Sequence, residues 1–152
     1  MMTVASAIII ALSLANTPPA TAATIDLSSA RILVEAPASQ RADVYATMLS
    51  DEVFKRVFVR WPIVHADSAN FSGVTITLAT NSSTEVDRSS PGAEGYELSV
   101  GAGGVRVTGA DQRGLLYGVG RLIRQMNLTM SENYFHARET TLTVPAPLTI
   151  RE

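Results

Sequence analysis

Acidic side chains are the residues of this chain best suited to acid–base chemistry, and five of them are candidates. Asp51 and Glu52 are adjacent within a stretch of helical periodicity, so their carboxylates point to different faces of that helix. Asp87 and Glu94 fall in a long polar stretch, and Asp111 precedes a second helical pattern. Carboxylates act as a catalytic acid and base only where the fold brings both to the same bond. This scattered spacing favours no catalytic residue in the chain.

Other reactive groups are equally scattered. His65 and His136 are far apart and show no HxH or HxxxH spacing, and the chain has no cysteine, so we expect no metal site and no cofactor. No serine falls in a G-x-S-x-G motif. The glycine-rich run 101–104 lacks the lysine and the following helix of a phosphate-binding loop. We interpret this run as a hairpin turn.

Residues 96–126 are predicted to form a strand, a tight turn, a second strand and a helix. Apolar and polar residues alternate over 96–100 and again over 105–107, which is typical of strands with one buried face. Asp111 is placed to cap the helix that follows, because its carboxylate can accept from free N–H groups of the first turn. The apolar stripe of this helix consists of Leu115, Leu116, Val119, Leu122, Ile123 and Met126.

Glycines inside that helix need a reason, because each costs about 0.5–1 kcal/mol relative to alanine. Gly114 and Gly118 are one helical turn apart, so they share a face. We predict that they are structural glycines, which let the helix backbone approach the preceding hairpin closely.

The rest of the chain predicts further strands and one more helix. Periodicity indicates a helix over 40–58, and residues 127–138 are interpreted as irregular. This order predicts an α+β fold, in which a largely antiparallel sheet has two helices packed on one face. The remaining extended segments are expected at 30–36, 63–65, 74–79, 140–144 and 148–150.

Residues 1–22 are interpreted as a signal peptide, followed by one domain over 23–152. The uncharged apolar run 4–15 is too short for a comfortable membrane span, and small residues follow it. The alternative is an apolar leading helix of the mature fold. Cleavage implies a secreted or secretory-lumen protein, extracellular, lysosomal or periplasmic, with no membrane partner afterwards. Sequons at Asn70, Asn81 and Asn127 are glycosylation candidates in a eukaryotic secretory pathway.

The composition limits the classes of binding partner that the chain is expected to have. The 152 residues carry a net charge of −2, and 46% are hydrophobic. These values are those of an ordinary globular domain, and the negative balance argues against nucleic acid or an anionic membrane as a partner.

The pattern over residues 92–126 resembles the end of the non-catalytic N-terminal domain of family-20 glycoside hydrolases, the β-N-acetylhexosaminidases. The similar N-terminal domain of family-67 α-glucuronidases is the near alternative. In both, a hairpin leads into a helix with the motif small-x-x-Gly-Leu-x-Tyr-Gly. The matching positions here are Ala110, Gly114, Leu115, Tyr117 and Gly118.

The resemblance implies an α+β accessory domain that supports a catalytic barrel, which hydrolyses N-acetylhexosamine glycosides. Because the catalytic acids of the family lie on that barrel, and we expect the barrel to be absent here, we expect the chain alone to be inactive. Asp111, Arg113 and Tyr117 match the most recognisable positions of the family. They would either form an interface with the barrel or belong to a capped helix whose side chains hold neighbouring loops.

A second hypothesis is a stand-alone secreted module that binds a glycan or a protein. Tyr45, Trp61, Tyr96 and Tyr134 could stack on sugar rings, although their spacing indicates no shared aromatic platform.

Overall fold

The computed structural model describes residues 23–35, 40–65, 71–81, 92–132 and 138–152. The predicted signal peptide (1–22) and the residues Asn70, Asp87, Tyr134 and His136 lie outside these ranges. The elements follow one another as β1 (Ala23–Asp26), β2 (Arg31–Val34), α1 (Gln40–Val57), β3 (Ile63–Val64), β4 (Thr75–Thr80), β5 (Tyr96–Gly101), β6 (Gly104–Gly109), α2 (Gln112–Gln125), β7 (Asn127–Glu132), β8 (Arg138–Ala146) and β9 (Leu148–Arg151).

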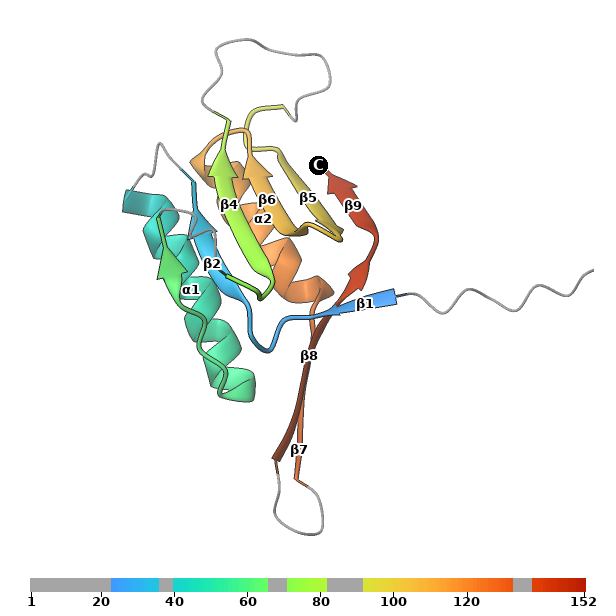
Figure 1. Ribbon diagram of the computed structural model, residues 1–152. Coiled ribbons are helices and arrows are strands. Elements are labelled where there is room, and N and C mark those ends of the chain that lie inside the picture. The colour runs from blue at the N-terminus through green and yellow to red at the C-terminus, as the bar shows by residue number, and fades with distance from the viewer. Residues whose placement is uncertain (1–22, 36–39, 66–70, 82–91, 133–137) are drawn as a thin grey trace, which may run out of the picture.

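The described strands form two sheets (Figure 1). The larger has the order β3-β2-β4-β6-β5-β9, and the smaller has the order β1-β8-β7. Strands β3, β2, β4 and β6 pair in parallel, whereas β5 pairs antiparallel with both β6 and β9. Both pairings of the small sheet are antiparallel as well, so four of the seven pairings are antiparallel. The predicted α+β class is therefore confirmed, with a parallel centre in the larger sheet.

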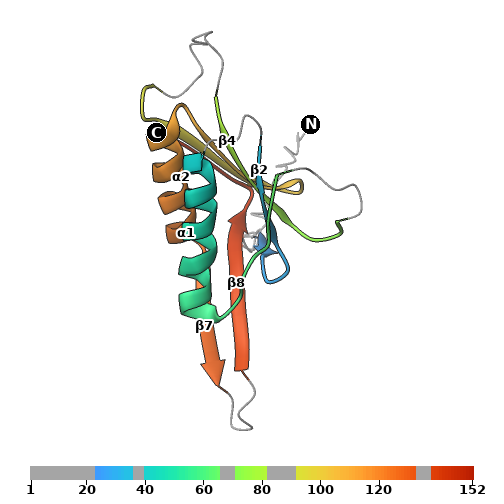
Figure 2. The same ribbon diagram turned by 90° about the vertical axis from the view of Figure 1, so that its left-hand side faces the viewer.

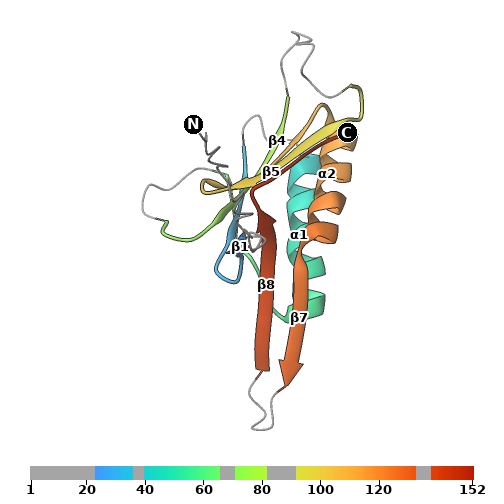
Figure 3. The same ribbon diagram turned by 90° about the vertical axis from the view of Figure 1, so that its right-hand side faces the viewer.

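Both helices pack on one face of the larger sheet, as predicted (Figures 2 and 3). Helix α2 lies against β4, β5 and β6, and α1 lies beside it against β2 and β4. Burial of one large aliphatic side chain contributes about 1.5–3 kcal/mol, so each large residue buried at this interface adds to the stability. The side of the helices that faces away from the sheet is covered by no described element. The interface buries Ala46, Leu49, Val53 and Val57 of α1 and Leu115, Val119 and Leu122 of α2.

The prediction that residues 127–138 are irregular was wrong for the described part of this stretch. Residues 127–132 form β7, which pairs with β8 in a ribbon that extends beyond the helices (Figure 1). Leu128 lies opposite Leu142, which is buried in the core. Such cross-strand pairs stabilise a two-stranded ribbon.

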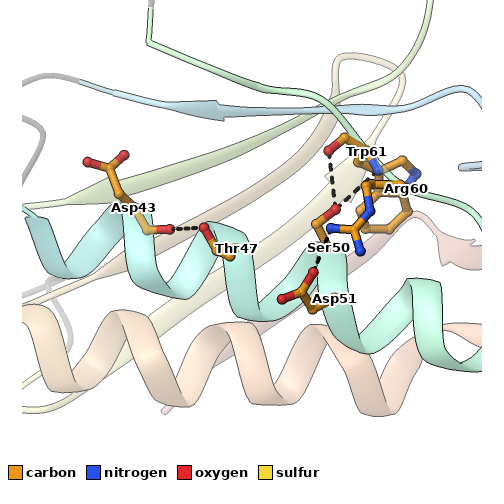
Figure 4. Close-up of polar contacts among 6 residues, drawn as sticks. All are labelled: Asp43, Thr47, Ser50, Asp51, Arg60 and Trp61. Carbon is orange, nitrogen blue, oxygen red and sulfur yellow. Dashed lines mark hydrogen bonds and ion pairs between the residues drawn. The ribbon is translucent and has the colours of Figure 1, made fainter.

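The turn after α1 is held by Trp61, whose ring is buried (Figure 4). The indole Nε1 donates to the backbone oxygen of Leu27 at 2.8 Å. The hydroxyl of Ser50 donates to the Trp61 carbonyl and accepts from the Trp61 N–H, both at 3.2 Å. These bonds join α1 to the loop before β3 and to the end of β1, so Trp61 is a structural residue.

Candidate functional site

Asp111 is the N-cap of α2, as the sequence predicts. Its Oδ1 accepts from the backbone N–H of Gly114 at 2.8 Å, and its Oδ2 accepts from the backbone N–H of Glu94 at 3.0 Å. These backbone donors, Gly114 first and Glu94 second, lower the pKa of Asp111 because they stabilise the charged carboxylate. One side chain therefore connects the start of α2 to the loop before β5.

Arg113 is attached to the same loop. Its Nη1 donates to Oε1 of Glu94 at 2.6 Å, and this carboxylate raises the pKa of Arg113. Glu94 has a φ of 64°, a left-handed conformation that is uncommon for residues other than glycine. Asp111 holds its backbone and Arg113 holds its carboxylate, which accounts for the persistence of this conformation. The sequence placed Glu94 only among the scattered acids, since both partners lie far along the chain.

Gly114 and Gly118 lie where the helix approaches the hairpin most closely. A Cβ atom on Gly114 would be 2.0 Å from the backbone oxygen of Gly95. A Cβ atom on Gly118 would be 2.6 Å from Cγ1 of Val107 and 3.2 Å from the side chain of Tyr96. Gly109 was not singled out from the sequence, yet a Cβ there would be 2.2 Å from the backbone N of Leu115. Gly109 lies two residues before the N-cap Asp111, and this position could have indicated a close contact with α2.

The outer helical face consists of Val44 and Met48 of α1 and Leu116, Tyr117 and Gly120 of α2. Val44, Met48 and Tyr117 are exposed to 61%, 38% and 49%. Two hollows meet on this face at Met48. One, of about 460 Å³, lies along α1 and is lined by Val44 and Met48 together with the polar and charged side chains of Asp43, Thr47, Asp51, Glu52 and Lys55. The other, a groove of about 520 Å³, includes Met48, Glu94, Tyr96, Tyr117, Arg124 and Glu152 in its lining.

The three predicted interface residues are thus neighbours through Glu94. Asp111 and Arg113 both bind Glu94, and Glu94 lines the groove together with Tyr117. Arg113 and Tyr117 are one helical turn apart, so they share an exposed side of α2. The loop at Glu94, which Asp111 and Arg113 hold, therefore lies in the same groove as the exposed ring of Tyr117.

Asp51, Glu52 and Asp43 line the hollow along α1. Asp51 binds Arg60 at 2.6 Å (Figure 4), and Glu52 binds Arg56 at 2.6 Å. His65 Nε2 lies 2.6 Å from Oδ1 of Asp43. Within the described ranges, no group of three or more His, Cys, Asp or Glu side chains could hold a metal ion.

The remaining candidates are the aromatic residues considered for sugar stacking and the asparagines considered for glycosylation. Trp61 and Tyr96 are only 2% and 3% exposed, so neither can stack on a sugar ring. Asn81 follows β4 and Asn127 begins β7, and both are exposed. No described helix is both long and apolar enough to cross a membrane.

Comparison with known proteins identifies one family. The sequence model for glycosyl hydrolase family 20, domain 2, matches residues 15–145. No curated protein matches the chain.

Solved structures show the same fold in larger enzymes. A family-20 β-N-acetylhexosaminidase from Streptomyces coelicolor A3(2) is 23% identical with a TM-score of 0.59, over 90% of this chain and 24% of that one. A β-hexosaminidase from Streptomyces plicatus is 21% identical with a TM-score of 0.56, over 89% and 24% of the two chains. The chitobiase of Flavobacterium johnsoniae is 13% identical with a TM-score of 0.56, over 87% and 19%. This chain spans about a quarter or less of the length of each.

Proposed function

Because the chain belongs to glycosyl hydrolase family 20, domain 2, we propose that it is a non-catalytic accessory domain of a secreted β-N-acetylhexosaminidase-like enzyme. In this proposal the domain supports a catalytic barrel that hydrolyses N-acetylhexosamine glycosides. The observation that carries it is the outer helical face, where Val44, Met48 and Tyr117 are exposed on two packed helices that no described element covers. Exposed apolar surface of this kind marks a site where another protein surface packs.

The acidic residues support a non-catalytic role. Glycoside hydrolysis uses two carboxyl groups on either side of the scissile bond, or one acid assisted by the substrate. The carboxylates of Asp51, Glu52 and Glu94 are each paired with an arginine, and that of Asp111 caps α2. Each has a structural partner, so none is a free acid in a substrate-sized pocket of its own.

The polar end of the groove supports the placement of the interface. Asp111 and Arg113 position the loop at Glu94, and this loop forms the rim beside Tyr117. A rigid polar rim around an apolar centre is the usual anatomy of a protein interface. We infer that Arg113 and Tyr117 contact the barrel directly and that Asp111 acts through the loop.

Secretion is part of the same proposal. It is supported by the apolar leader over residues 1–22 and by the exposed positions of Asn81 and Asn127. Edman sequencing of the protein secreted by its own host tests the leader. An amino terminus at Ala23 supports cleavage, whereas retention of Met1 contradicts it.

Two experiments test the accessory role. Sequencing of the genomic DNA after the codon for Glu152 should reveal an open frame that encodes a barrel with an adjacent Asp-Glu pair. The 152-residue chain alone should release no product from an aryl N-acetylglucosaminide. A stop codon followed by unrelated sequence, or turnover by the chain alone, would contradict the proposal.

The alternative, a stand-alone module that binds a glycan or a protein, remains a separate hypothesis. The burial of Trp61 and Tyr96 removes two of its aromatic candidates. A glycan array probed with the chain tests the sugar version, and reproducible binding to one glycan class would favour it over the accessory role.

A further inference from the structure

Strand β7 has an unpaired edge. It is the last strand of the smaller sheet, whose order is β1-β8-β7, and no described element pairs with it on the side away from β8. It has six residues, whereas the other edge strands are shorter, with four residues in β1 and β9 and two in β3. Short length is one way in which proteins protect a sheet edge from pairing with another chain. Among the described strands, β7 therefore has the longest unprotected edge.

The alternation of hydrogen bonds shows which backbone groups lie on this edge. The N–H of Leu27 donates to the carbonyl of Leu142 at 2.7 Å, so the polar backbone groups of Leu142 face β1. Leu128 lies opposite Leu142 in an antiparallel register, so its N–H and C=O point away from β8. Met130 lies two residues further along and points the same way. No backbone hydrogen bond joins either residue to a described residue outside the ribbon of β7 and β8.

The sequence of β7 lacks the other features that protect an edge. No proline or lysine falls within Asn127–Glu132, and the register with β8 contains no bulge. The one charged residue, Glu132, is the last of the strand. Met130 is 40% exposed, and its neighbours Thr129 and Ser131 are exposed as well. The edge is therefore regular, accessible and flanked by an exposed apolar side chain.

The free edge faces the same way as the outer helical face. Figures 2 and 3 show the ribbon face-on, with β8 toward the larger sheet and β7 on the side of the helices. The unpaired edge of β7 therefore points away from the larger sheet, as the outer helical face does. Strand β7 also follows α2 directly and packs beside α1. The helical face and the edge form one continuous side of the domain.

The chemistry of the edge specifies an extended polypeptide as its partner. Donors and acceptors that alternate along a strand edge are matched by another extended backbone, as in β-strand addition. A second copy of this chain could offer such an edge through its own β7. Antiparallel pairing of two β7 strands would place the helices of the two copies at opposite ends of the joined ribbons, because α2 leads into the start of β7. Both helical faces would then stay uncovered. A partner that covers the helical face also reaches the edge, which favours that partner over a second copy.

We propose that an extended segment of the catalytic barrel domain pairs with β7 as a fourth strand of the smaller sheet. This inference rests on the proposed function, because the barrel is the partner that packs on the outer helical face. The added strand would exchange hydrogen bonds with the backbone of Leu128 and Met130. Apolar contacts are not directional, so these bonds would fix the position of the barrel along the helices.

The first experiment compares hydrogen–deuterium exchange in the 152-residue chain and in the full enzyme encoded by the same gene. In the 152-residue chain, the N–H groups of Leu128 and Met130 should exchange faster than those of Thr129 and Ser131, which bond to β8. In the full enzyme, exchange at Leu128 and Met130 should slow by about tenfold or more. Equal exchange at these two positions in both proteins would overturn the inference. Slowing that grows with the concentration of the 152-residue chain alone would assign the edge to a second copy and would also overturn it.

The second experiment uses the barrel encoded by the same gene as a separate polypeptide. Met130→Pro removes an edge N–H and keeps the bonds to β8, because an edge strand tolerates proline where its N–H faces solvent. It should raise the Kd of the barrel about tenfold, since a carbonyl of the added strand loses its donor. Met130→Ala changes the side chain alone and should weaken binding less. Because the exchange experiment needs no substitution, it decides the matter if the proline variant fails to fold.

Thr149→Pro is the matched control. Tyr96 and Glu152 exchange both of their backbone hydrogen bonds, so the N–H of Thr149 points away from β5, at the free edge of β9. This variant also removes one edge N–H, but at an edge of the larger sheet. It should leave the Kd of the barrel within about twofold, a change that is small beside the tenfold effect of one lost bond. An equal loss of binding in Thr149→Pro and Met130→Pro would overturn the assignment to β7.

The two proposals fail in different ways. If Met48→Glu weakens binding of the barrel while Met130→Pro and the exchange of the edge show no effect, the accessory role stands and the pairing at β7 is wrong. If the barrel does not bind the chain at all, both the accessory role and the pairing are wrong.

Discussion

The carboxylate of Asp111 accepts a hydrogen bond from the backbone N–H of Glu94 at 3.0 Å, although the two residues are 17 positions apart. The other oxygen of the same carboxylate caps α2 through the N–H of Gly114. A single side chain thus sets the first turn of the helix and the left-handed backbone of Glu94 together. Loss of this carboxylate should disturb both features at once.

Asp111→Ala should lower Tm by about 5 °C, because the cap and the bond to Glu94 are lost together. Asp51→Ala is the control, since it removes only an exposed ion pair with Arg60 and should change Tm little. Differential scanning calorimetry provides the measurement. Equal shifts for the two variants would show that the cap contributes nothing beyond surface charge.

The contribution of Asp111 should also depend on pH. The donors from Gly114 and Glu94 lower its pKa below the ordinary value of 3.8. A lowered pKa in the folded state means that the stabilisation is complete above pH 3.8 and disappears as the pH falls through the folded value. Urea unfolding should therefore separate the wild type from Asp111→Asn at pH 6 and separate them less at pH 2.5. A constant separation would contradict the assigned bonds.

The helix glycines should differ sharply in their tolerance of alanine. Gly114→Ala should lower the free energy of unfolding by at least about 2 kcal/mol, because its Cβ would meet the backbone oxygen of Gly95. Gly118→Ala should cost less, since its nearest obstacle is a side-chain methyl of Val107. Gly120→Ala is the matched control. Its nearest atom would be Nη1 of Arg124 at 3.5 Å, so it should be neutral or stabilise by up to about 1 kcal/mol.

Chemical denaturation of the three glycine variants measures the change in the free energy of unfolding for each and ranks them. If Gly114→Ala were no worse than Gly120→Ala, the close approach of α2 to the loop before β5 would be disproved.

Local sequence patterns were sufficient for the elements whose partners are near in the chain. The cap at Asp111 and the hairpin of β5 and β6 are each formed by one continuous stretch of the chain, and both were predicted. Helix α1 was predicted over 40–58 and observed over Gln40–Val57, because its stripe repeats at helical spacing over many turns.

The pairings between elements that are distant in the chain were not predicted. Strand β7 pairs with β8, and its own alternation is short, with Leu128 and Met130 as its apolar positions. The parallel centre of the larger sheet is set by which strands become neighbours, which alternation within one strand cannot indicate. The role of Glu94 was missed for the same reason, because Asp111 and Arg113 bind it from 17 and 19 positions away.

Trp61 should be sensitive to loss of its indole nitrogen. Trp61→Phe removes the donor to the buried backbone oxygen of Leu27 and should destabilise the chain by about 1–3 kcal/mol from the hydrogen bond alone. Ser50→Ala removes the two bonds to the Trp61 backbone and should cost about 1 kcal/mol. Thermal unfolding of both variants checks these values, and unchanged Tm in Trp61→Phe would show that Leu27 finds another donor.

The outer helical face should tolerate charge in the isolated chain and resist it in the complex with the barrel. Val44→Glu and Met48→Glu should change the free energy of unfolding by less than about 0.5 kcal/mol, because both side chains are exposed. Each should raise the Kd for the separately expressed barrel about tenfold or more, since a buried unpaired charge at an interface is costly. Isothermal titration calorimetry measures this change.

Thr149→Glu provides the control for these two variants. Thr149 is exposed on β9, and its pairing with Ser99 places it on the side of the sheet away from the helices. Its variant should bind the barrel like the wild type. If Thr149→Glu weakened binding as much as Met48→Glu, the barrel would not be docking specifically on the helices. Unchanged binding for Met48→Glu would place the interface elsewhere on the domain.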